Sequence, residues 1–322
     1  MQNAFVVLSA FVFDFLVGDP SWLPHPVRFL GRVIWFFERL IRRLAGGPAA
    51  LWVGGVFLSI VVPVGTYMAA DAGLDLLYRW HREAGFLAEV YLVAMSIAVK
   101  GLSAAAEAVR RPLVAGNLAA AREQVAAIVG RDTTQLDAGG VVRAAVESVA
   151  ENSVDAVVAP LFYAFAGGAP LALAYRAVNT LDSMVGYRDQ QYRHLGWASA
   201  RLDDLLNFIP ARLTGLLITL AAFPGRGDWR RVWRVMRRDG RKHPSPNSGI
   251  PEAAMAGFLG VQLGGLIQYK GVLSSRPLLG EPLVPLRPEH IACAVRMLNG
   301  VAMLAVGTGI GLRLLISYLT AR

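Results

Sequence analysis

The apolar stretch that decides the fold reads Ala49-Ala-Leu-Trp-Val-Gly-Gly-Val-Phe-Leu-Ser-Ile-Val-Val-Pro-Val-Gly-Thr-Tyr-Met-Ala-Ala70 and carries no charged side chain. A helix needs about 20 such residues to cross the hydrocarbon core of a membrane. Other runs approach that length, namely Phe86–Val99 (short), Ala156–Ala174, Leu205–Phe223 and Met297–Leu319. We therefore predict an all-α fold, a polytopic membrane bundle with about five spanning or re-entrant helices.

The composition agrees with a membrane protein, because 55% of the residues are hydrophobic and only 17% are charged. The single Cys293 excludes a disulfide framework or a cysteine-rich metal site within one chain. A further apolar run, Ala253–Ile267, is rich in small residues, and we expect it to be buried or to dip only partway into the membrane.

Two of the predicted spans contain residues that are unusual inside a spanning helix. Pro160, Gly167, Gly168 and Pro170 lie in the first, and Pro210 together with Arg212 lies in the second. Broken helices of this kind are tolerated in membranes where they line a polar cavity. We expect both segments to be broken or re-entrant.

The net charge of +9 comes from basic residues that flank the apolar runs. Loops on the cytoplasmic side of membrane proteins are enriched in Lys and Arg, and this explains the basic residues better than binding to nucleic acid does. No nucleic-acid partner is therefore predicted. Two basic loops are expected on the cytoplasmic side of the cell (inner) membrane, one with Arg28, Arg32, Arg39, Arg42 and Arg43 and one with Arg226, Arg230, Arg231, Arg234, Arg237, Arg238, Arg241 and Lys242. Residues 100–150 are then a cytoplasmic helical insertion within a single membrane domain, 1–322.

Three carboxylates at i, i+4 and i+8 form the first candidate site, Glu147, Glu151 and Asp155. On a regular helix they share one face, where like charges repel unless a cation lies among them. A divalent metal, or a polyanion carried with its metal, would satisfy all three. A plainer alternative is that the carboxylates stabilise the positive N-terminal end of a helix dipole. That stabilisation fades within one turn and does not account for all three.

A second cluster places Arg176, Asn179 and Ser183 on one helical face, with Asp182 at its edge and Tyr187 beyond. A cation, an amide and hydroxyl groups suit a phosphate or a carboxylate substrate. An interhelical hydrogen-bond network is the structural alternative.

A third cluster, Asp203-Asp204 with Asn207 and Arg212, combines paired carboxylates with an amide at i+4. Mg²⁺ prefers such oxygen ligands and is often held together with substrate phosphates. An ordinary helix cap at the membrane surface is the alternative.

The loop His243-Pro-Ser245-Pro-Asn247-Ser248-Gly249 is a candidate anion cradle, because it precedes a helix whose N-terminal end is positive. A plain connecting turn uses the same residue types.

Near the N-terminus, Asp14 lies in an apolar run and is expected to face a cavity, and the motif residues Asp19-Pro20 and His25-Pro26 follow it.

Taken together, several motifs in this order resemble the adenosylcobinamide-phosphate synthase family, whose members are integral membrane enzymes of cobalamin (vitamin B12) biosynthesis. They are Asp19-Pro20, His25-Pro26-Val27, Glu147-Ser-Val-Ala-Glu151-Asn152, Asn179-Thr-Leu-Asp182-Ser183-Met-Val-Gly-Tyr187, Asp203-Asp204, Ile209-Pro-Ala-Arg212-Leu-Thr214 and His243-Pro-Ser-Pro-Asn-Ser-Gly249. No P-loop, HExxH, GxSxG or cysteine-ligand pattern competes with this resemblance.

The resemblance implies an ATP-dependent ligation of aminopropanol, or of its O-phosphate, to a propionate carboxylate of adenosylcobyric acid. It also implies Mg²⁺ as cofactor, the lipid bilayer as surroundings and other late enzymes of the pathway as candidate membrane partners. A Mg²⁺-dependent intramembrane prenyl- or alcohol-phosphate transferase and a membrane transporter or sensor stay open as alternatives.

Our hypothesis for the site assigns each candidate a role. Catalysis falls to Glu147, Glu151, Asp155 and Asp182, and Mg²⁺ binding falls to Glu151, Asp155, Asp203 and Asp204. Substrate or phosphate binding is assigned to Asn152, Arg176, Asn179, Ser183, Tyr187, Asn207, Arg212, His243, Ser245, Asn247 and Ser248.

Overall fold

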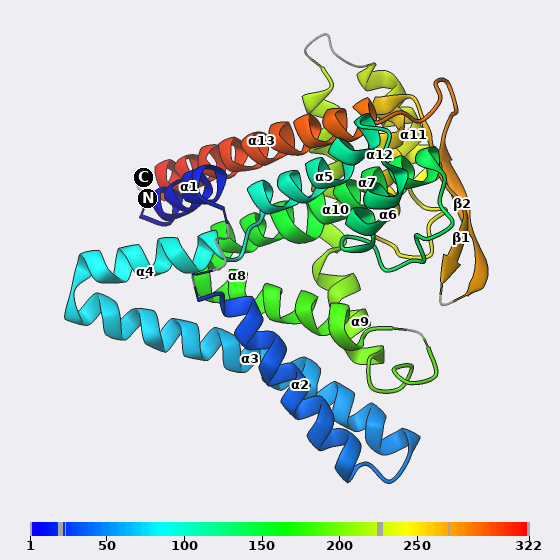
Figure 1. The fold of residues 1–322 in the computed structure, drawn as a ribbon. Coiled ribbons are helices and arrows are strands. Elements are labelled where there is room, and N and C mark those ends of the chain that lie inside the picture. The colour runs from blue at the N-terminus through cyan, green and yellow to red at the C-terminus, as the bar shows by residue number, and fades with distance from the viewer. Residues whose placement is uncertain are drawn as a thin grey trace. The chain divides into compact units, whose positions relative to one another are not determined.

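A computed structural model describes residues 2–18, 22, 24–187, 189–223, 228–269 and 271–320. The sequence motif residues Asp19 and Pro20, and the basic residues Arg188 and Arg226, lie outside this described part. Most of the described chain is helical, with one two-stranded sheet (Figure 1), so the predicted all-α membrane fold is confirmed.

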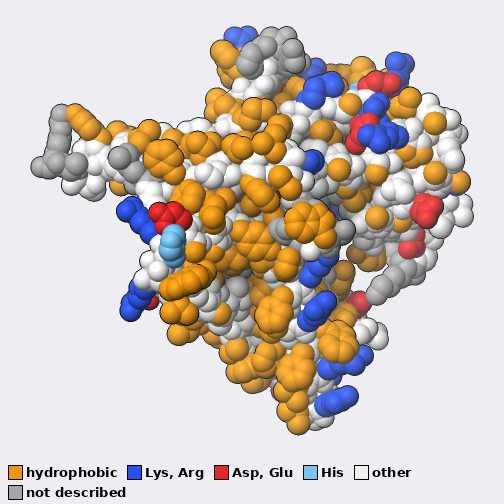
Figure 2. Space-filling model, turned by 60° about the vertical axis from the view of Figure 1, so that its left-hand side comes forward, with side chains coloured by type: hydrophobic (Ala, Val, Ile, Leu, Met, Phe, Trp, Pro, Cys, Tyr) orange, Lys and Arg blue, Asp and Glu red, His pale blue; other side chains and the backbone are white. Residues whose placement is uncertain are grey.

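Four helical stretches are long and apolar enough to cross a membrane, namely Pro48–Trp80, Arg82–Val114, Ala138–Val185 and Glu289–Thr320. A fifth is obtained if the bent pair Trp197–Leu206 and Phe208–Ala221 counts as one span. Four of the five predicted runs fall within these segments, and the fifth, Leu205–Phe223, extends two residues past Ala221. Many large hydrophobic side chains are exposed, and Figure 2 shows them covering much of one face of the molecule, as expected for surfaces that meet lipid.

The chain divides into two compact units. The first unit holds residues 1–98, 159–207 and 306–322. Its helices are α1 (Gln2–Leu16), α2 (Pro26–Leu44), α3 (Pro48–Trp80), α4 (Arg82–Ala94), α8 (Ala159–Val185) and α9 (Trp197–Leu206), with the last part of α13 (Glu289–Thr320).

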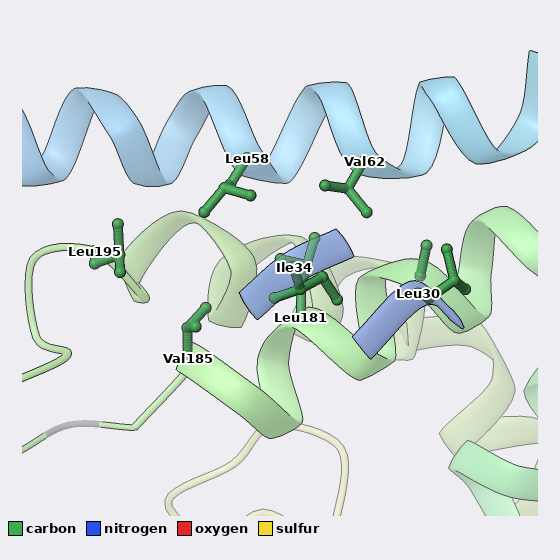
Figure 3. Close-up of a cluster of buried hydrophobic side chains, with 8 residues drawn as sticks. Leu30, Ile34, Leu58, Val62, Leu181, Val185 and Leu195 are labelled. Carbon is green, nitrogen blue, oxygen red and sulfur yellow. The ribbon is translucent and has the colours of Figure 1, made fainter. Parts of the chain in front are cut away.

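The core of the first unit lies where α2, α3 and α8 meet. Figure 3 shows Leu30 and Ile34 of α2, Leu58 and Val62 of α3, and Leu181 of α8 pointing toward one another. Ile34 and Leu181 are fully buried. Apolar side chains at i and i+4 give α2 and α3 matching stripes, and burial of these stripes fixes how the helices pack.

The predicted break in α8 is present at Gly167 and Gly168. Gly168 has φ 69° and ψ −164°, a region open almost only to glycine, and Pro170 follows at the start of the next helical segment. The glycine pair therefore interrupts the helix, and proline allows it to restart.

The other predicted break occurs at a different residue. The axis bends by 44° between α9 and α10 (Phe208–Ala221), and the residue at the bend is Asn207 rather than Pro210. Pro210 lies in the first turn of α10, where the missing backbone N–H costs no hydrogen bond. The expected break in the segment 205–223 is therefore present, and it lies at Asn207.

The two predicted basic loops are helices in the structure. Arg28 to Arg43 lie on α2, and Arg230 to Arg238 lie on α11 (Trp229–Asp239). Both helices are strongly amphipathic, because their arginines recur with helical spacing opposite an apolar stripe. Charge density alone therefore indicated the wrong secondary structure.

The second unit holds residues 99–158 and 208–305. Its elements are α5 (Val99–Val114), α6 (Leu118–Ala126), α7 (Ala138–Ser153), the π-helical turn η1 (Val154–Val158), α10, α11, α12 (Gly249–Leu259), strands β1 (Gln262–Tyr269) and β2 (Val272–Gly280), and the first part of α13. The predicted helical insertion, residues 100–150, supplies α5, α6 and most of α7.

The apolar run Ala253–Ile267 is split between a helix and a strand. α12 is almost wholly buried, and Gly260, with φ 67°, ends it before β1 begins. β1 pairs with β2 as an antiparallel hairpin, with Gln262 opposite Gly280 and Tyr269 opposite Val272. The hairpin was not predicted, because its residues lack a clean alternation of apolar and polar side chains.

Gly55 of α3 provides a test of packing in the first unit. A Cβ atom at Gly55 would lie 2.0 Å from the carbonyl oxygen of Leu195, whereas one at Gly65 on the same helix would meet nothing within 4 Å. Gly55→Ala should lower the free energy of unfolding by roughly 1–3 kcal/mol through overpacking. Gly65→Ala, the matched control, should not destabilise the protein. Thermal unfolding in detergent measures both, and equal midpoints for the two variants would contradict the packing described here.

Candidate functional site

Glu147 of α7 holds the β-hairpin and the segment before α7 in place. Only 2% of the residue is exposed. One carboxylate oxygen accepts a hydrogen bond from Arg131, with which it forms a buried ion pair, and the other accepts one from the backbone N–H of Gly264 at 2.7 Å. The carbonyl of the same residue is also bound, because Arg143 Nη1 donates to the Gly264 oxygen at 3.2 Å. Both oxygens of Glu147 are thus engaged by the protein.

Glu151 lies one turn further along α7 and is half-buried. Its Oε1 accepts a hydrogen bond from the Ser248 hydroxyl at 2.9 Å. Asn152, the next residue, donates from Nδ2 to the Ser148 carbonyl at 2.9 Å. The predicted carboxylate series therefore divides, since Glu147 points into the fold while Glu151 meets the 243–248 segment.

Asp155, the third member of the series, lies in the π-helical turn η1. Such a turn contains one residue more than an α-helical turn and changes the direction of the side chains that follow it. The regular i, i+4, i+8 face expected from the sequence is therefore not continuous through Asp155. π-Helical turns are frequent at functional sites, and Asp155 stays a candidate on that ground.

Residues 243–248 form a turn stabilised by its own side chains. His243 Nδ1 accepts from the Ser245 N–H at 3.0 Å, and Ser245 Oγ accepts from the N–H groups of Asn247 and Ser248, both at 3.3 Å. These three amides are therefore already bonded and are not part of an open anion cradle.

A cation reaches this turn from α10. Arg212 Nη1 donates to Asn247 Oδ1 at 3.3 Å and to the Phe208 carbonyl at 2.7 Å, while its guanidinium lies over the Phe208 ring. Ser248 bonds Glu151 and its neighbour Asn247 bonds Arg212. One short segment thus links a carboxylate to a guanidinium.

His243 and Glu252 form a buried pair that the sequence pattern alone does not indicate. Glu252 is 1% exposed in the first turn of α12, and its Oε1 lies 3.9 Å from His243 Nε2. Neither atom has a hydrogen-bond partner among the described residues. Since His243 Nδ1 is an acceptor, the neutral ring carries its proton on Nε2, facing Glu252.

Electrostatics favour the neutral forms of both side chains. Burial, followed by the charges of Glu151 and Glu147, raises the pKa of Glu252 well above its ordinary value of 4.5. Burial, followed by the positive charge of Arg276, lowers the pKa of His243. In the sequence, Glu252 has the pattern of an acidic residue that complements the first turn of a helix, so only its burial distinguishes it.

In the first unit, a polar network connects α8 with α9. Asp203 accepts hydrogen bonds from Asn207 Nδ2 at 3.0 Å and from Asn179 Nδ2 at 3.4 Å. Asn179 in turn accepts from Arg176 Nη1 at 3.2 Å, and Asn207 accepts from the Tyr175 hydroxyl at 2.9 Å. The structure therefore brings these two predicted clusters together.

The remaining predicted residues of the first unit lie around this network. Asp182 and Asp204 are close enough to act electrostatically on Asp203, and Asp204 also pairs with Arg201 at 3.4 Å. The Ser183 hydroxyl donates to the carbonyl of Asn179, and Tyr187 is 45% exposed. Tyr163 stacks on Tyr175 with ring centroids 5.0 Å apart.

Within the described part of the chain, no three His, Cys, Asp or Glu side chains are grouped closely enough to hold a metal ion by themselves. The four predicted Mg²⁺ ligands divide between the units, with Glu151 and Asp155 in the second and Asp203 and Asp204 in the first. Neither pair forms an all-protein metal cage.

Comparison with known proteins gives a consistent result. A family model described as CobD/Cbib protein matches residues 7–298. The cobalamin biosynthesis protein CobD of Geobacter metallireducens is 49% identical over 304 residues, which cover 94% of each chain. CobD of Klebsiella pneumoniae is 45% identical and CbiB of Salmonella typhimurium 44% identical, each over 94% of this chain and 95% of the relative. No solved structure matches the chain with significance.

The environment of Glu252 predicts how stability depends on pH. The unfolded chain loses the Glu252 proton near its ordinary pKa of 4.5, whereas the folded chain retains it to higher pH. Stability from this group is therefore complete below pH 4.5 and is lost as the pH rises toward the raised pKa. Glu252→Gln, which stays neutral, should gain stability relative to the wild type as the pH rises.

Unfolding midpoints between about pH 5 and pH 8, measured with a chelator present, test this dependence. Glu123→Gln is the control, because Glu123 is exposed on α6. Parallel pH curves for the wild type and Glu252→Gln would contradict the buried, protonated state of Glu252.

Proposed function

Because this chain belongs to the CobD/Cbib family and takes part in cobalamin biosynthesis, we propose that it is an ATP-dependent acid–amine ligase. The proposed reaction joins aminopropanol, or aminopropanol O-phosphate, to a propionate carboxylate of adenosylcobyric acid. The product is adenosylcobinamide or its phosphate.

The chemistry requires activation, because a carboxylate and an ammonium ion do not condense favourably in water. In the proposed sequence a carboxylate oxygen attacks the γ-phosphorus of ATP and ADP leaves. The free amine then attacks the acyl carbon, and inorganic phosphate departs with the former carboxylate oxygen. One proton from the ammonium group passes to a base before the attack, and a second leaves the nitrogen as the amide forms.

The observation that carries the proposal is the link from Glu151 through Ser248 and Asn247 to Arg212 in the second unit. It presents an acidic group and a cationic group from neighbouring positions. Phosphoryl transfer needs this combination, because a guanidinium binds phosphate oxygens while a carboxylate binds the metal that accompanies them.

The residues also suit Mg²⁺ carried by ATP. A nucleotide-bound Mg²⁺ takes one or two protein carboxylates and keeps phosphate and water oxygens as its other ligands. Glu151 and Asp155 are half-buried oxygen donors, whereas both oxygens of Glu147 are engaged by Arg131 and Gly264. Bound there, Mg²⁺ would neutralise charge that develops on the phosphates.

The individual roles follow from these contacts. We propose that Glu151 and Asp155 bind the metal and accept the proton of the amine. Arg212 and Asn247 are proposed to bind the phosphates. Glu147, predicted as catalytic from the sequence, is proposed instead to act as a positioning residue. In the first unit, Asp182, Asp203 and Asp204 provide negative charge that suits a metal or an ammonium group, and they are proposed for those roles.

One assay separates the three candidate functions. Purified protein is incubated with adenosylcobyric acid, Mg²⁺ and each form of the amine, with and without ATP, and the products are analysed by mass. Amide formation that requires ATP supports the ligase. Transfer without ATP would indicate a transferase, and uptake into vesicles without covalent change would indicate a transporter, so either result would overturn the proposal.

Glu151→Gln should reduce turnover by roughly 10²–10³-fold, the usual cost of removing one preorganised charge at a reacting phosphate. The fold should be retained, because Gln can still accept the hydrogen bond from Ser248. Glu147→Gln, in contrast to Glu151→Gln, should lower the unfolding midpoint, since it leaves the buried Arg131 without its charged partner.

Glu123→Gln is the matched control for both variants and should leave turnover and stability unchanged. Near-normal ligation by Glu151→Gln would exclude Glu151 from the site.

Asp203→Asn tests the network of the first unit. The substitution keeps the size of the side chain and removes its charge, but it leaves one acceptor oxygen, so one of the two hydrogen bonds from Asn207 and Asn179 is lost. We expect turnover per folded molecule to fall by about 10²-fold, in addition to any small lowering of the unfolding midpoint by the lost bond. If instead the midpoint falls while turnover per folded molecule is preserved, Asp203 is a structural residue.

A further inference from the structure

The β-hairpin of the second unit carries a charged residue to which the proposed ligation gives no role. This residue is Arg276 of β2, and it is half-buried. Within the described part of the chain, its guanidinium forms no hydrogen bond and no ion pair. Two other arginines near the hairpin are bonded, Arg131 to Glu147 and Arg143 to the Gly264 carbonyl. Arg276 therefore differs from them in having its donors available for a ligand.

The hairpin that carries Arg276 is anchored by buried carboxylates on two helices. Figure 1 shows the hairpin beside α7, α11 and α12. On β1, the Gly264 N–H donates to Glu147 of α7 at 2.7 Å. On β2, the Gly280 N–H donates to the fully buried Asp239 of α11 at 2.9 Å. Both strands are thus bound to helices, so the strand that carries Arg276 has a fixed place in the unit.

A β-bulge interrupts β2 next to Arg276. Between the Gly265–Arg276 pair and the following pair, β2 has two residues where β1 has only Gly264. Gly264 has φ 82°, and a Cβ atom on it would clash with the carbonyl of Pro277. The extra residue of a bulge bends its strand and redirects side chains beside it, and bulges are frequent next to active sites. The bulge therefore gives Arg276 a direction that a regular hairpin would not.

The positive charge of Arg276 reaches the candidate site. Burial lowers the pKa of His243 most, and the charge of Arg276 lowers it further. Burial raises the pKa of Glu252, and the charge of Arg276 opposes that rise. The negative charge of Glu151 acts on the same two side chains. Arg276 from the hairpin and Glu151 from α7 are therefore both close to the His243–Glu252 pair.

The acidic side chains around Arg276 have other partners or are neutral. Glu147 is paired with Arg131, Glu151 accepts from Ser248, and burial favours the neutral form of Glu252. A guanidinium presents parallel N–H donors that match two oxygens of a carboxylate or of a phosphate. A substrate with either group would supply the partner that the protein itself does not provide.

We propose that Arg276 binds an anionic group of a substrate, either a carboxylate of the corrinoid acid or the phosphates of ATP. This inference deepens the proposed function and rests on it for the identity of the substrates. Arg212 of α10 and Arg276 of β2 then contribute one guanidinium each from separate elements of the second unit. Because Arg276 contacts the substrate, its loss weakens binding and leaves the fold intact.

Equilibrium binding of two probes to the purified full-length protein in detergent tests the inference. The probes are ATP with Mg²⁺ and adenosylcobyric acid, each measured alone. Arg276→Gln should weaken the binding of at least one probe by about 10- to 100-fold, the usual loss for a charged hydrogen bond. Weaker binding of ATP identifies the phosphates as the partner, and weaker binding of the acid identifies a carboxylate. Arg276→Lys keeps the charge but not the planar donors, so its affinity should be intermediate.

Arg234→Gln is the matched control, because it removes the same charge from an exposed position on α11 of the same unit. Unfolding midpoints verify that all variants are folded. Unchanged binding of both probes by Arg276→Gln, or equal weakening by Arg234→Gln, would overturn the inference. Binding does not require amide formation, so a wild type that binds the probes without ligating them would refute the proposed ligase and still test Arg276.

Discussion

Polar groups on apolar helices must find partners inside the protein, because lipid offers none, and the structure depends on this constraint. In the first unit one network supplies these partners: Asp203 accepts hydrogen bonds from Asn207 and Asn179, and Asn207 accepts one from Tyr175. In the second unit the partners of Glu147 are Arg131 and the backbone N–H of Gly264. The same contacts that satisfy these groups also determine which side chains stay accessible for chemistry.

The sequence predicted the membrane fold and its broken helices because these follow from local composition. Gly167 and Gly168 interrupt α8 as expected, since the conformation of Gly168 is open almost only to glycine. The break in the segment 205–223 lies at Asn207 and not at Pro210, because a proline in a first turn is compatible with a helix. Arginine-rich segments were read as loops from their charge, although the spacing of Arg28 to Arg43 is that of an amphipathic helix.

The candidate site was predictable only in part, because a carboxylate spacing does not reveal which oxygens the fold already uses. Glu147 and Glu151 are one turn apart, yet Glu147 is buried against Arg131 while Glu151 meets Ser248. The π-helical turn at Asp155 could not be read from residue types. Glu252 was overlooked because burial, not sequence position, separates it from an ordinary acidic residue at a helix start.

The central claim is that a carboxylate oxygen of the corrinoid acid attacks ATP before the amide forms. The most direct measurement uses adenosylcobyric acid labelled with ¹⁸O in the reacting carboxylate, with ATP, Mg²⁺ and the amine. We predict that each amide formed is accompanied by one inorganic phosphate that carries a single ¹⁸O atom. Amide formation with unlabelled phosphate would contradict this account.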